Sequence, residues 1–176
     1  MGKFYSLAKD DFKKIGDLNI SFSTKVADRV LRAHGQALHD IYILRNSVFK
    51  RIPDIVLWPK CHDDVVRIVT LANECNIVII PFGGGTAVSG AVECPVNEQR
   101  PIISLDTSQM NKILWIDKSN LIACCESGIL GQDLERELGK LGCYIENKEV
   151  HVNFRYNRKC QTDAIILVRK IMSENP

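Results

Sequence analysis

The sequence predicts an α+β fold in which a β-α-β unit is followed by further strands, a hairpin and a helix, with a helical segment ahead of them. Three observations predict it. Two β-branched runs flank a segment of helical periodicity between residues 52 and 80. Two apolar runs then flank the polar stretch 117–120, a pattern typical of a hairpin. Leucines recur at helical spacing between residues 132 and 141, which predicts a closing helix.

The composition narrows the class of protein. At 176 residues the chain is long enough for one domain with a sizeable core. A formal net charge of +2, with Lys and Arg scattered along the chain, argues against a nucleic-acid partner. No apolar run approaches the roughly 20 residues that a membrane-spanning helix needs, so no transmembrane segment is expected.

The seven cysteines predict buried, reduced thiols. Their number is odd, and no C-x-x-C pair occurs. An odd set of cysteines without such spacing does not indicate a disulfide framework. The four histidines show no ligand spacing with the cysteines, so the sequence predicts no metal site.

Residues 1–50 are expected to form a helical segment, because they are rich in charge and helix-forming residues. Apolar residues recur at mostly helical intervals from Asp28 to Phe49, which predicts one packed helix there. His34 and His39 lie in this segment, and neither is assigned a role.

The β-α-β unit begins at 52–59, a short run bracketed by prolines that predicts an edge strand. A helix is predicted from His62 to Cys75. Asp63 and Asp64 fall in its first turn, where the helix dipole stabilises carboxylates. The two aspartates are therefore interpreted as partners of the dipole and not as a catalytic pair. Its apolar stripe is predicted to consist of Val65, Val66, Ile68, Val69, Ala72 and Cys75.

A glycine-rich loop follows the second strand of the unit. Pro81 is expected to end that strand, because proline has no N–H for the ladder. Glycines at 83–85 free the backbone, and successive amide N–H groups in such a turn can form a concave nest for an anion. The loop has no lysine of a P-loop, and Val88 stands where a Rossmann fingerprint has its third glycine. A phosphate-binding loop and a plain turn between two strands both remain open from these residues alone.

Four further elements are expected after the loop. They are a strand at 101–106, hairpin strands at 113–116 and 121–125, and a helix at 132–141 that Gly142 terminates. Leu134, Leu138 and Leu141 are expected to form the buried face of that helix. The last stretch, 143–176, has a basic and aromatic run at 153–159, interpreted as surface, and an apolar run at 164–168 that predicts a short helix or strand.

Several longer runs occur in an order that identifies a family. They are RIPDIVLWP at 51–59, HDDVV at 62–66, IIPFGGGT at 79–86, ISLDTSQMN at 103–111 and ESGI at 126–129. With these runs the chain resembles the alkylglycerone-phosphate synthase family, also called alkyl-dihydroxyacetonephosphate synthases. These are flavoproteins of the vanillyl-alcohol-oxidase type with a PCMH-type FAD-binding domain. The resemblance covers roughly residues 20 to 142.

The resemblance implies FAD as cofactor and places it at the glycine-rich loop. In the family this loop wraps the FAD pyrophosphate with main-chain N–H groups. The implied cofactor-binding residues here are Pro81, Phe82, Gly83, Gly84, Gly85, Thr86 and Ala87. Phe82 and Ala87 stand where the family usually has a smaller aliphatic residue and a serine. The implied organisation is a helical segment at 1–50, a partial FAD-binding domain at 51–142 and a divergent tail at 143–176.

The implied activity is a transferase reaction of ether-lipid (plasmalogen) biosynthesis, in which the acyl chain of acyl-dihydroxyacetone phosphate is exchanged for a fatty alcohol. The family's flavin-contacting segments beyond Gly142, its cap and its catalytic residues have no counterpart here, so no catalytic residue is assigned. The alternative is a catalytically incompetent, truncated product that binds FAD weakly or associates with the full-length synthase. Another FAD-linked oxidase with the same loop is a third interpretation. The family implies a peroxisomal location, and without a recognisable targeting signal the chain as written is expected in the cytosol.

Overall fold

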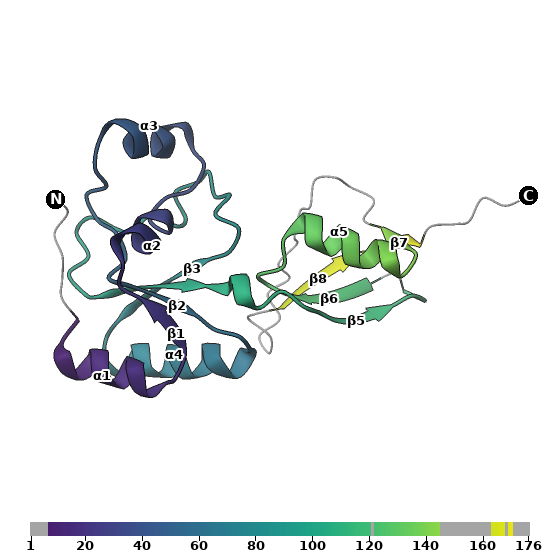
Figure 1. The fold of residues 1–176 in the computed structure, drawn as a ribbon, viewed down its shortest axis with the longest axis horizontal. Coiled ribbons are helices and arrows are strands. Elements are labelled where there is room, and N and C mark those ends of the chain that lie inside the picture. Colours follow the sequence, from purple (N-terminus) through teal and green to yellow (C-terminus); the bar gives the residue numbers. More distant parts are fainter. Residues whose placement is uncertain (1–6, 121, 145–162, 168, 171–176) are drawn as a thin grey trace, which may run out of the picture. The chain divides into compact units, whose positions relative to one another are not determined.

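The computed structural model describes residues 7–120, 122–144, 163–167 and 169–170. The chain forms two compact units, Met1–Gln109 and Met110–Pro176. Both units combine helices with sheets, and the predicted α+β class is confirmed (Figure 1).

A four-stranded sheet forms the centre of the first unit. Its strand order is β1-β2-β4-β3, with β2, β4 and β3 parallel to one another and β1 antiparallel to β2. Parallel strands need a crossover, which the helix between β2 and β3 provides. The four strands are β1 (Ser21–Ser23), β2 (Ile55–Trp58), β3 (Val78–Phe82) and β4 (Ile102–Asp106).

Helices cover both faces of this sheet. Helix α4 (His62–Glu74) packs on β3 and on α1 (Lys9–Asp17), and these two helices lie on one face (Figure 1). Helix α2 (Val26–Leu31) packs on β2 from the other face, which also carries α3 (Leu38–Asn46). A short 3-10 helix (Thr107–Gln109) follows β4. The apolar core between the layers is deepest at Ile15, Ile55, Leu57, Ile68, Ile102 and Ile103.

The single helix predicted from Asp28 to Phe49 is wrong, because two helices, α2 and α3, occupy this stretch. Between α2 and α3, backbone N–H groups form other hydrogen bonds in place of those of a continuous helix. The N–H of Gln36 donates to the carbonyl of Ala87 at 2.8 Å, and the N–H of Gly35 donates to Oδ2 of Asp40 at 3.1 Å. The spacing of apolar residues alone does not reveal hydrogen-bond partners that are distant in the sequence.

Two predictions about strand ends are also corrected. Strand β2 is not an edge, because β1 from the predicted helical segment pairs with it as Phe22 with Leu57. Strand β3 continues through Pro81 to Phe82, with Pro81 aligned to Leu105. Since β3 is itself an edge strand, a residue without an N–H is tolerated in it.

Helix α4 was predicted within one residue of its end, but its buried face differs. Val66 and Val69 are 47% and 46% exposed, whereas Leu71 is buried. Val65, Ile68 and Ala72 are buried as expected. The buried stripe of α4 is narrower than the run of valines indicates, because only the side chains that face the sheet and α1 are shielded from solvent.

In the second unit the predicted hairpin and helix are present. Strands β5 (Ile113–Asp117) and β6 (Ile122–Glu126) are antiparallel, and β8 (Asp163–Leu167) pairs with β6. The described part of the apolar run, 164–167, thus lies in a strand. Helix α5 (Gly131–Lys140) buries Leu134 and Leu138, but Leu141, expected in that face, is 48% exposed. A further pair joins β7 (Cys143–Tyr144) to β9 (Arg169–Lys170), and the run at 153–159 lies outside the described residues.

The thiols agree with the prediction of reduced cysteines. All six cysteines in the described part of the chain are free, and four of them, Cys94, Cys124, Cys125 and Cys143, are buried. Burial raises the pKa of the Cys125 thiol to about 11, which keeps it protonated at neutral pH. Within the described ranges no helix is both long and apolar enough to cross a membrane.

Candidate functional site

The glycine-rich loop leaves the sheet where the parallel strands end. It begins after Phe82, at the carboxyl end of β3, beside the end of β4 at Asp106. Ligands of open parallel sheets bind outside the carboxyl ends of the strands. The loop predicted from the sequence to hold a phosphate therefore lies at the edge where such a ligand is expected.

The loop needs glycine for two separate reasons. Gly85 has φ +71°, in the left-handed region that side chains disfavour. A Cβ on Gly85 would also lie 2.8 Å from the ring of the buried Phe82. Gly83, by contrast, is exposed and has no atom within 4 Å of its Cβ direction. The loop is thus closed against Phe82 on its inner side and open to solvent at Gly83 and Gly84.

A second glycine holds the far end of the loop. A Cβ on Gly35 would lie 1.9 Å from the carbonyl oxygen of Ala87, so the two backbones are in direct contact. The same carbonyl accepts the hydrogen bond from the N–H of Gln36. The connector between α2 and α3 therefore fixes the position of Ala87, while Thr86 before it is exposed.

A guanidinium lies at the base of the loop. The Nε of Arg32 donates to Oδ2 of Asp106 at 2.6 Å, and Nε1 of Trp58 donates to the same oxygen at 2.9 Å. The guanidinium lies 5.0 Å from the centre of the Trp58 ring and 5.8 Å from that of Phe82, within the range of cation–π contacts. This cluster was not identified from the sequence as part of the site.

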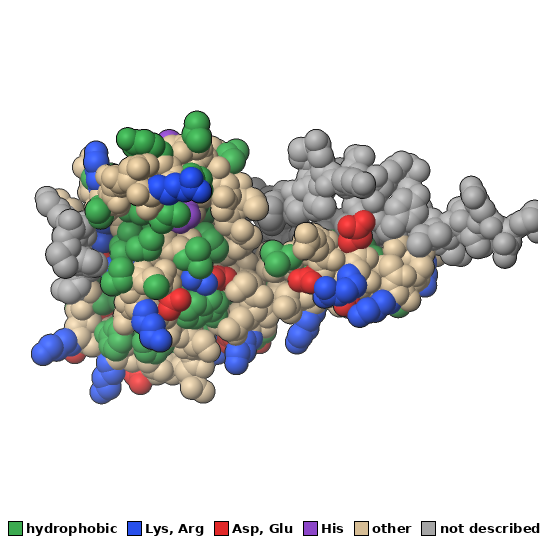
Figure 2. All heavy atoms as spheres, turned by 45° about the horizontal axis from the view of Figure 1, so that its top comes forward, with side chains coloured by type: hydrophobic (Ala, Val, Ile, Leu, Met, Phe, Trp, Pro, Cys, Tyr) green, Lys and Arg blue, Asp and Glu red, His purple; other side chains and the backbone are tan. Residues whose placement is uncertain are grey.

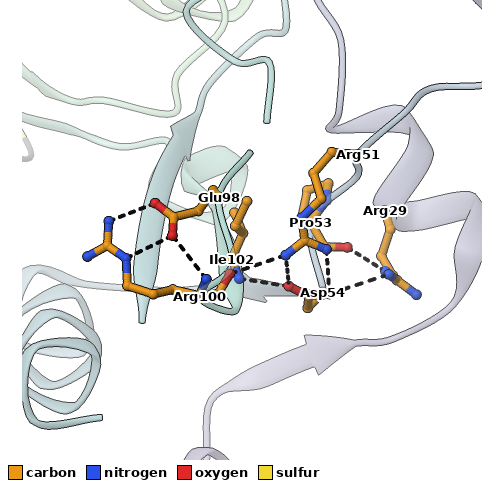
Figure 3. A network of polar contacts seen from close by, with 7 residues as sticks. All are labelled: Arg29, Arg51, Pro53, Asp54, Glu98, Arg100 and Ile102. Carbon is orange, nitrogen blue, oxygen red and sulfur yellow. Dashed lines mark hydrogen bonds and ion pairs between the residues drawn. The ribbon is translucent and has the colours of Figure 1, made fainter. Parts of the chain in front are cut away.

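A buried ion cluster lies at the amino-terminal ends of β2 and β4, opposite the ends that carry the glycine loop (Figure 3). Asp54, just before β2, accepts from Nη1 of Arg51 at 3.0 Å and from Nη2 at 2.7 Å. Its Oδ2 also accepts the N–H of Ile102, the first residue of β4, at 2.8 Å. Arg29 lies 4.0 Å from Oδ1 of Asp54 and donates to the carbonyl of Pro53. The cluster fixes the register of β2 with β4, which is a structural role at the edge away from the glycine loop.

The remaining polar residues singled out in the sequence do not join the loop. His34 is buried with its ring stacked on Phe49 at 5.2 Å. Asp64 in the first turn of α4 accepts the N–H of Lys60 and pairs with Arg67. Burial alone raises the pKa of Asp64, but these two partners outweigh burial and hold it below the usual value. These contacts give Asp64 a structural role at the start of α4.

The residues present fit the diphosphate part of a dinucleotide. Open, side-chain-free positions at 83 and 84 let an anion approach the main chain, and Gly85 gives the loop its left-handed turn. Backbone donors of this kind bind phosphates without a lysine.

Comparison with known proteins agrees with this geometry. The family described as FAD binding domain matches residues 53–150. The alkyldihydroxyacetonephosphate synthase of Caenorhabditis elegans is 43% identical over 134 residues, which are 76% of this chain and 22% of that protein. The synthase of Dictyostelium discoideum is 41% identical over 114 residues, covering 65% of this chain and 18% of that protein. The chain thus spans about a fifth of the length of these relatives.

A solved structure extends the likeness to three dimensions. A structure of an alkyldihydroxyacetonephosphate synthase superimposes with a TM-score of 0.77 at 32% identity, over 82% of this chain and 28% of that one. A berberine bridge enzyme variant superimposes with a TM-score of 0.58 at 17% identity, which shows a shared fold alone.

Proposed function

The chain belongs to the FAD-binding-domain family, and from this premise we propose that residues 81–87 hold the pyrophosphate of FAD through main-chain N–H groups. The observation that carries the proposal is the conformation of the loop. Gly83 and Gly84 are exposed at the carboxyl end of β3, and Gly85 takes φ +71°. FAD supplies the reactive isoalloxazine when bound, and the chain supplies binding and orientation.

The side chains around the loop have supporting roles in this proposal. The ring of Phe82 packs against Gly85, and the carbonyl of Ala87 accepts a hydrogen bond from the N–H of Gln36. The charge of Arg32 is largely neutralised by Asp106, so the pyrophosphate is held mainly by neutral backbone donors. Hydrogen bonds to a charged group contribute about 1.5–3 kcal/mol each, which makes a few amides sufficient for recognition but insufficient for tight binding.

The wider protein we infer is an alkyldihydroxyacetonephosphate synthase. The support is the similarity to such synthases from two organisms and to a solved structure of one. On this inference the chain carries the pyrophosphate-binding part of an enzyme that exchanges the acyl chain of acyl-dihydroxyacetone phosphate for a fatty alcohol. The place of action is then ether-lipid biosynthesis in the peroxisome. The division into 1–50, 51–142 and 143–176 remains part of the same proposal.

A second candidate function is association with another protein surface, the full-length synthase being the expected partner. Exposed apolar residues gather on the face of the first unit that carries α2 and α3 (Figure 2). Leu38 is 88% exposed, Tyr42 66% and Val88 71%. A concentration of large exposed apolar side chains favours a protein contact.

Two measurements test these functions separately. Isothermal titration of the 176-residue chain with FAD should give binding that Gly84→Val abolishes and Gly139→Val, in the exposed surface of α5, leaves unchanged. Equal FAD binding by Gly84→Val would refute the loop assignment.

Incorporation of radiolabelled fatty alcohol tests the transferase inference. We expect none from this chain alone, because the described residues supply no catalytic set, and turnover would show that the chain by itself is catalytically competent.

The partner is tested by pull-down with full-length synthase. Retention at micromolar concentration is expected, and Leu38→Ser combined with Tyr42→Ser should weaken it. Absence of retention, or retention that the double variant leaves unchanged, would reject the association through α3.

A further inference from the structure

A cavity of ≈ 260 Å³ opens beside α3 in the first unit. Its lining combines residues from the first turn of α3, His39 and Asp40, with Glu93 and Cys94 from the segment after the loop. One imidazole and two carboxylates of the lining come together. One ligand atom from each of His39, Asp40 and Glu93 lies within 4.8 Å of the others.

Asp40 is the unusual member of this group. It is 1% exposed, and its Oδ2 accepts the N–H of Gly35 at 3.1 Å. Its Oδ1 is buried and has no hydrogen-bond partner among the described residues. The Nδ1 of His39 lies 3.5 Å from this oxygen. Leaving a buried carboxylate oxygen without a hydrogen bond is costly, and Asp40 lines the cavity, so this oxygen points to a missing cation.

The neighbouring residues are placed as metal ligands usually are. The Gly35 amide donates to Oδ2 of Asp40 and leaves Oδ1 without a hydrogen bond, which is the arrangement of an outer-shell hydrogen bond that orients a ligand. The carboxylate of Glu93 is placed by a turn, since Gly90 has φ +76° and a Cβ there would lie 3.1 Å from Oε1 of Glu93. His39 has a side chain that is 63% exposed, so an ion can reach the group from solvent.

The donor set narrows the kind of ion. Imidazole with carboxylates suits Zn²⁺ and related transition metals, while Mg²⁺ and Ca²⁺ prefer oxygen alone. Bonds of about 2.0–2.2 Å place two ligands up to about 4 Å apart across a metal, so small side-chain movements close the group. Cys94 lines the same cavity, but the ligand atoms that lie within 4.8 Å of one another belong to His39, Asp40 and Glu93 alone among the described residues. The charge of Arg51 in the same lining is compensated by Asp54.

We propose that His39, Asp40 and Glu93 form a Zn²⁺ site that joins α3 to the segment following the glycine loop. The site is separate from the proposed FAD contacts and does not depend on them. Because Gly35 connects Asp40 to Ala87, a bound ion also stiffens the far end of the loop.

The test is thermal unfolding of the 176-residue chain with Zn²⁺, after removal of metal with a chelator and dialysis. At a Zn²⁺ concentration 100 times its Kd, the melting temperature should rise by about 5–10 °C. His39→Ala and Glu93→Gln should each weaken Zn²⁺ binding at least about tenfold in calorimetric titration, the scale on which a lost ligand or ligand support acts. Both changes avoid the buried Asp40, so the variants should fold.

The matched control removes another pair of potential ligands. Cys61 and His62 are adjacent and exposed, and Cys61→Ser with His62→Ala should leave the Zn²⁺ shift unchanged. A shift that disappears in this control but survives in Glu93→Gln would overturn the proposal, because the ion would then bind at the start of α4. Absence of any shift in the unmodified chain would overturn it as well. Co²⁺ substitution adds a readout, since N and O ligands without thiolate should give no sulfur-to-metal charge-transfer band.

Discussion

Replacing Gly35 by alanine should destabilise the first unit and loosen the glycine loop. The added Cβ would lie 1.9 Å from the carbonyl oxygen of Ala87, far inside van der Waals contact. The obstructing atom belongs to the backbone, so no side-chain rotation relieves the overlap. The two segments must separate, and the hydrogen bond from Gln36 to Ala87, 2.8 Å long in the native chain, is then lost.

The magnitude follows from these two effects together. Overpacking costs about 1–3 kcal/mol and a hydrogen bond about 1 kcal/mol, so the free energy of unfolding should fall by about 2–4 kcal/mol. Urea unfolding followed by tryptophan fluorescence measures it, because Trp58 lies in the same unit. The control is Gly16→Ala in α1, where the new methyl group meets nothing within 4 Å. A helical position of this kind should gain about 0.5–1 kcal/mol. If Gly35→Ala unfolds at the urea concentration of the unmodified chain, the close contact with Ala87 is refuted.

Three further outcomes are expected. Asp54→Ala removes the carboxylate that pairs with the buried guanidinium of Arg51 and should lower the free energy of unfolding in urea by about 3–5 kcal/mol, whereas Glu98→Gln should change it little. The pKa of Asp64 lies below its ordinary 3.8, so its stabilisation is present above that pH and is lost as the pH falls through the folded pKa; Asp64→Asn should flatten acid unfolding in that range. The purified chain should be colourless, with a Kd for FAD of roughly 0.1–1 mM, because a few amides must offset the entropy of association. Stoichiometric flavin absorbance after purification would contradict this last expectation.

Local signals in the sequence predicted most elements well. Helix α4 is bounded by Cys61 and Cys75 much as its periodicity indicates, and the hairpin turn at 117–120 has the expected polar residues. In that turn Oδ1 of Asp117 accepts the N–H groups of Ser119 and Asn120. Signals of this kind lie within a few residues of one another, so they can be recognised in a single sequence.

The errors share a cause, which is dependence on distant partners. The break between α2 and α3 follows from contact of Gly35 with Ala87, more than fifty residues later. Strand β2 is an inner strand because β1 pairs with it. With only three residues, β1 is too short to show an alternating pattern in the sequence. At the site, the glycines were identified from their place after a buried strand and from the family resemblance, but Arg32 joins them only through Asp106 and the ring of Phe82. Such pairings become visible only once the chain is folded.

The most direct test of the central claim is an amide chemical-shift titration of the ¹⁵N-labelled chain. FAD and ADP share a pyrophosphate, and riboflavin has the flavin ring without it. FAD and ADP should both shift the amides of Gly83, Gly84 and Gly85, and riboflavin should leave them in place. Shifts with riboflavin of the same size at these glycines, or FAD-induced shifts confined to other residues, would contradict the assignment of the loop as the pyrophosphate site.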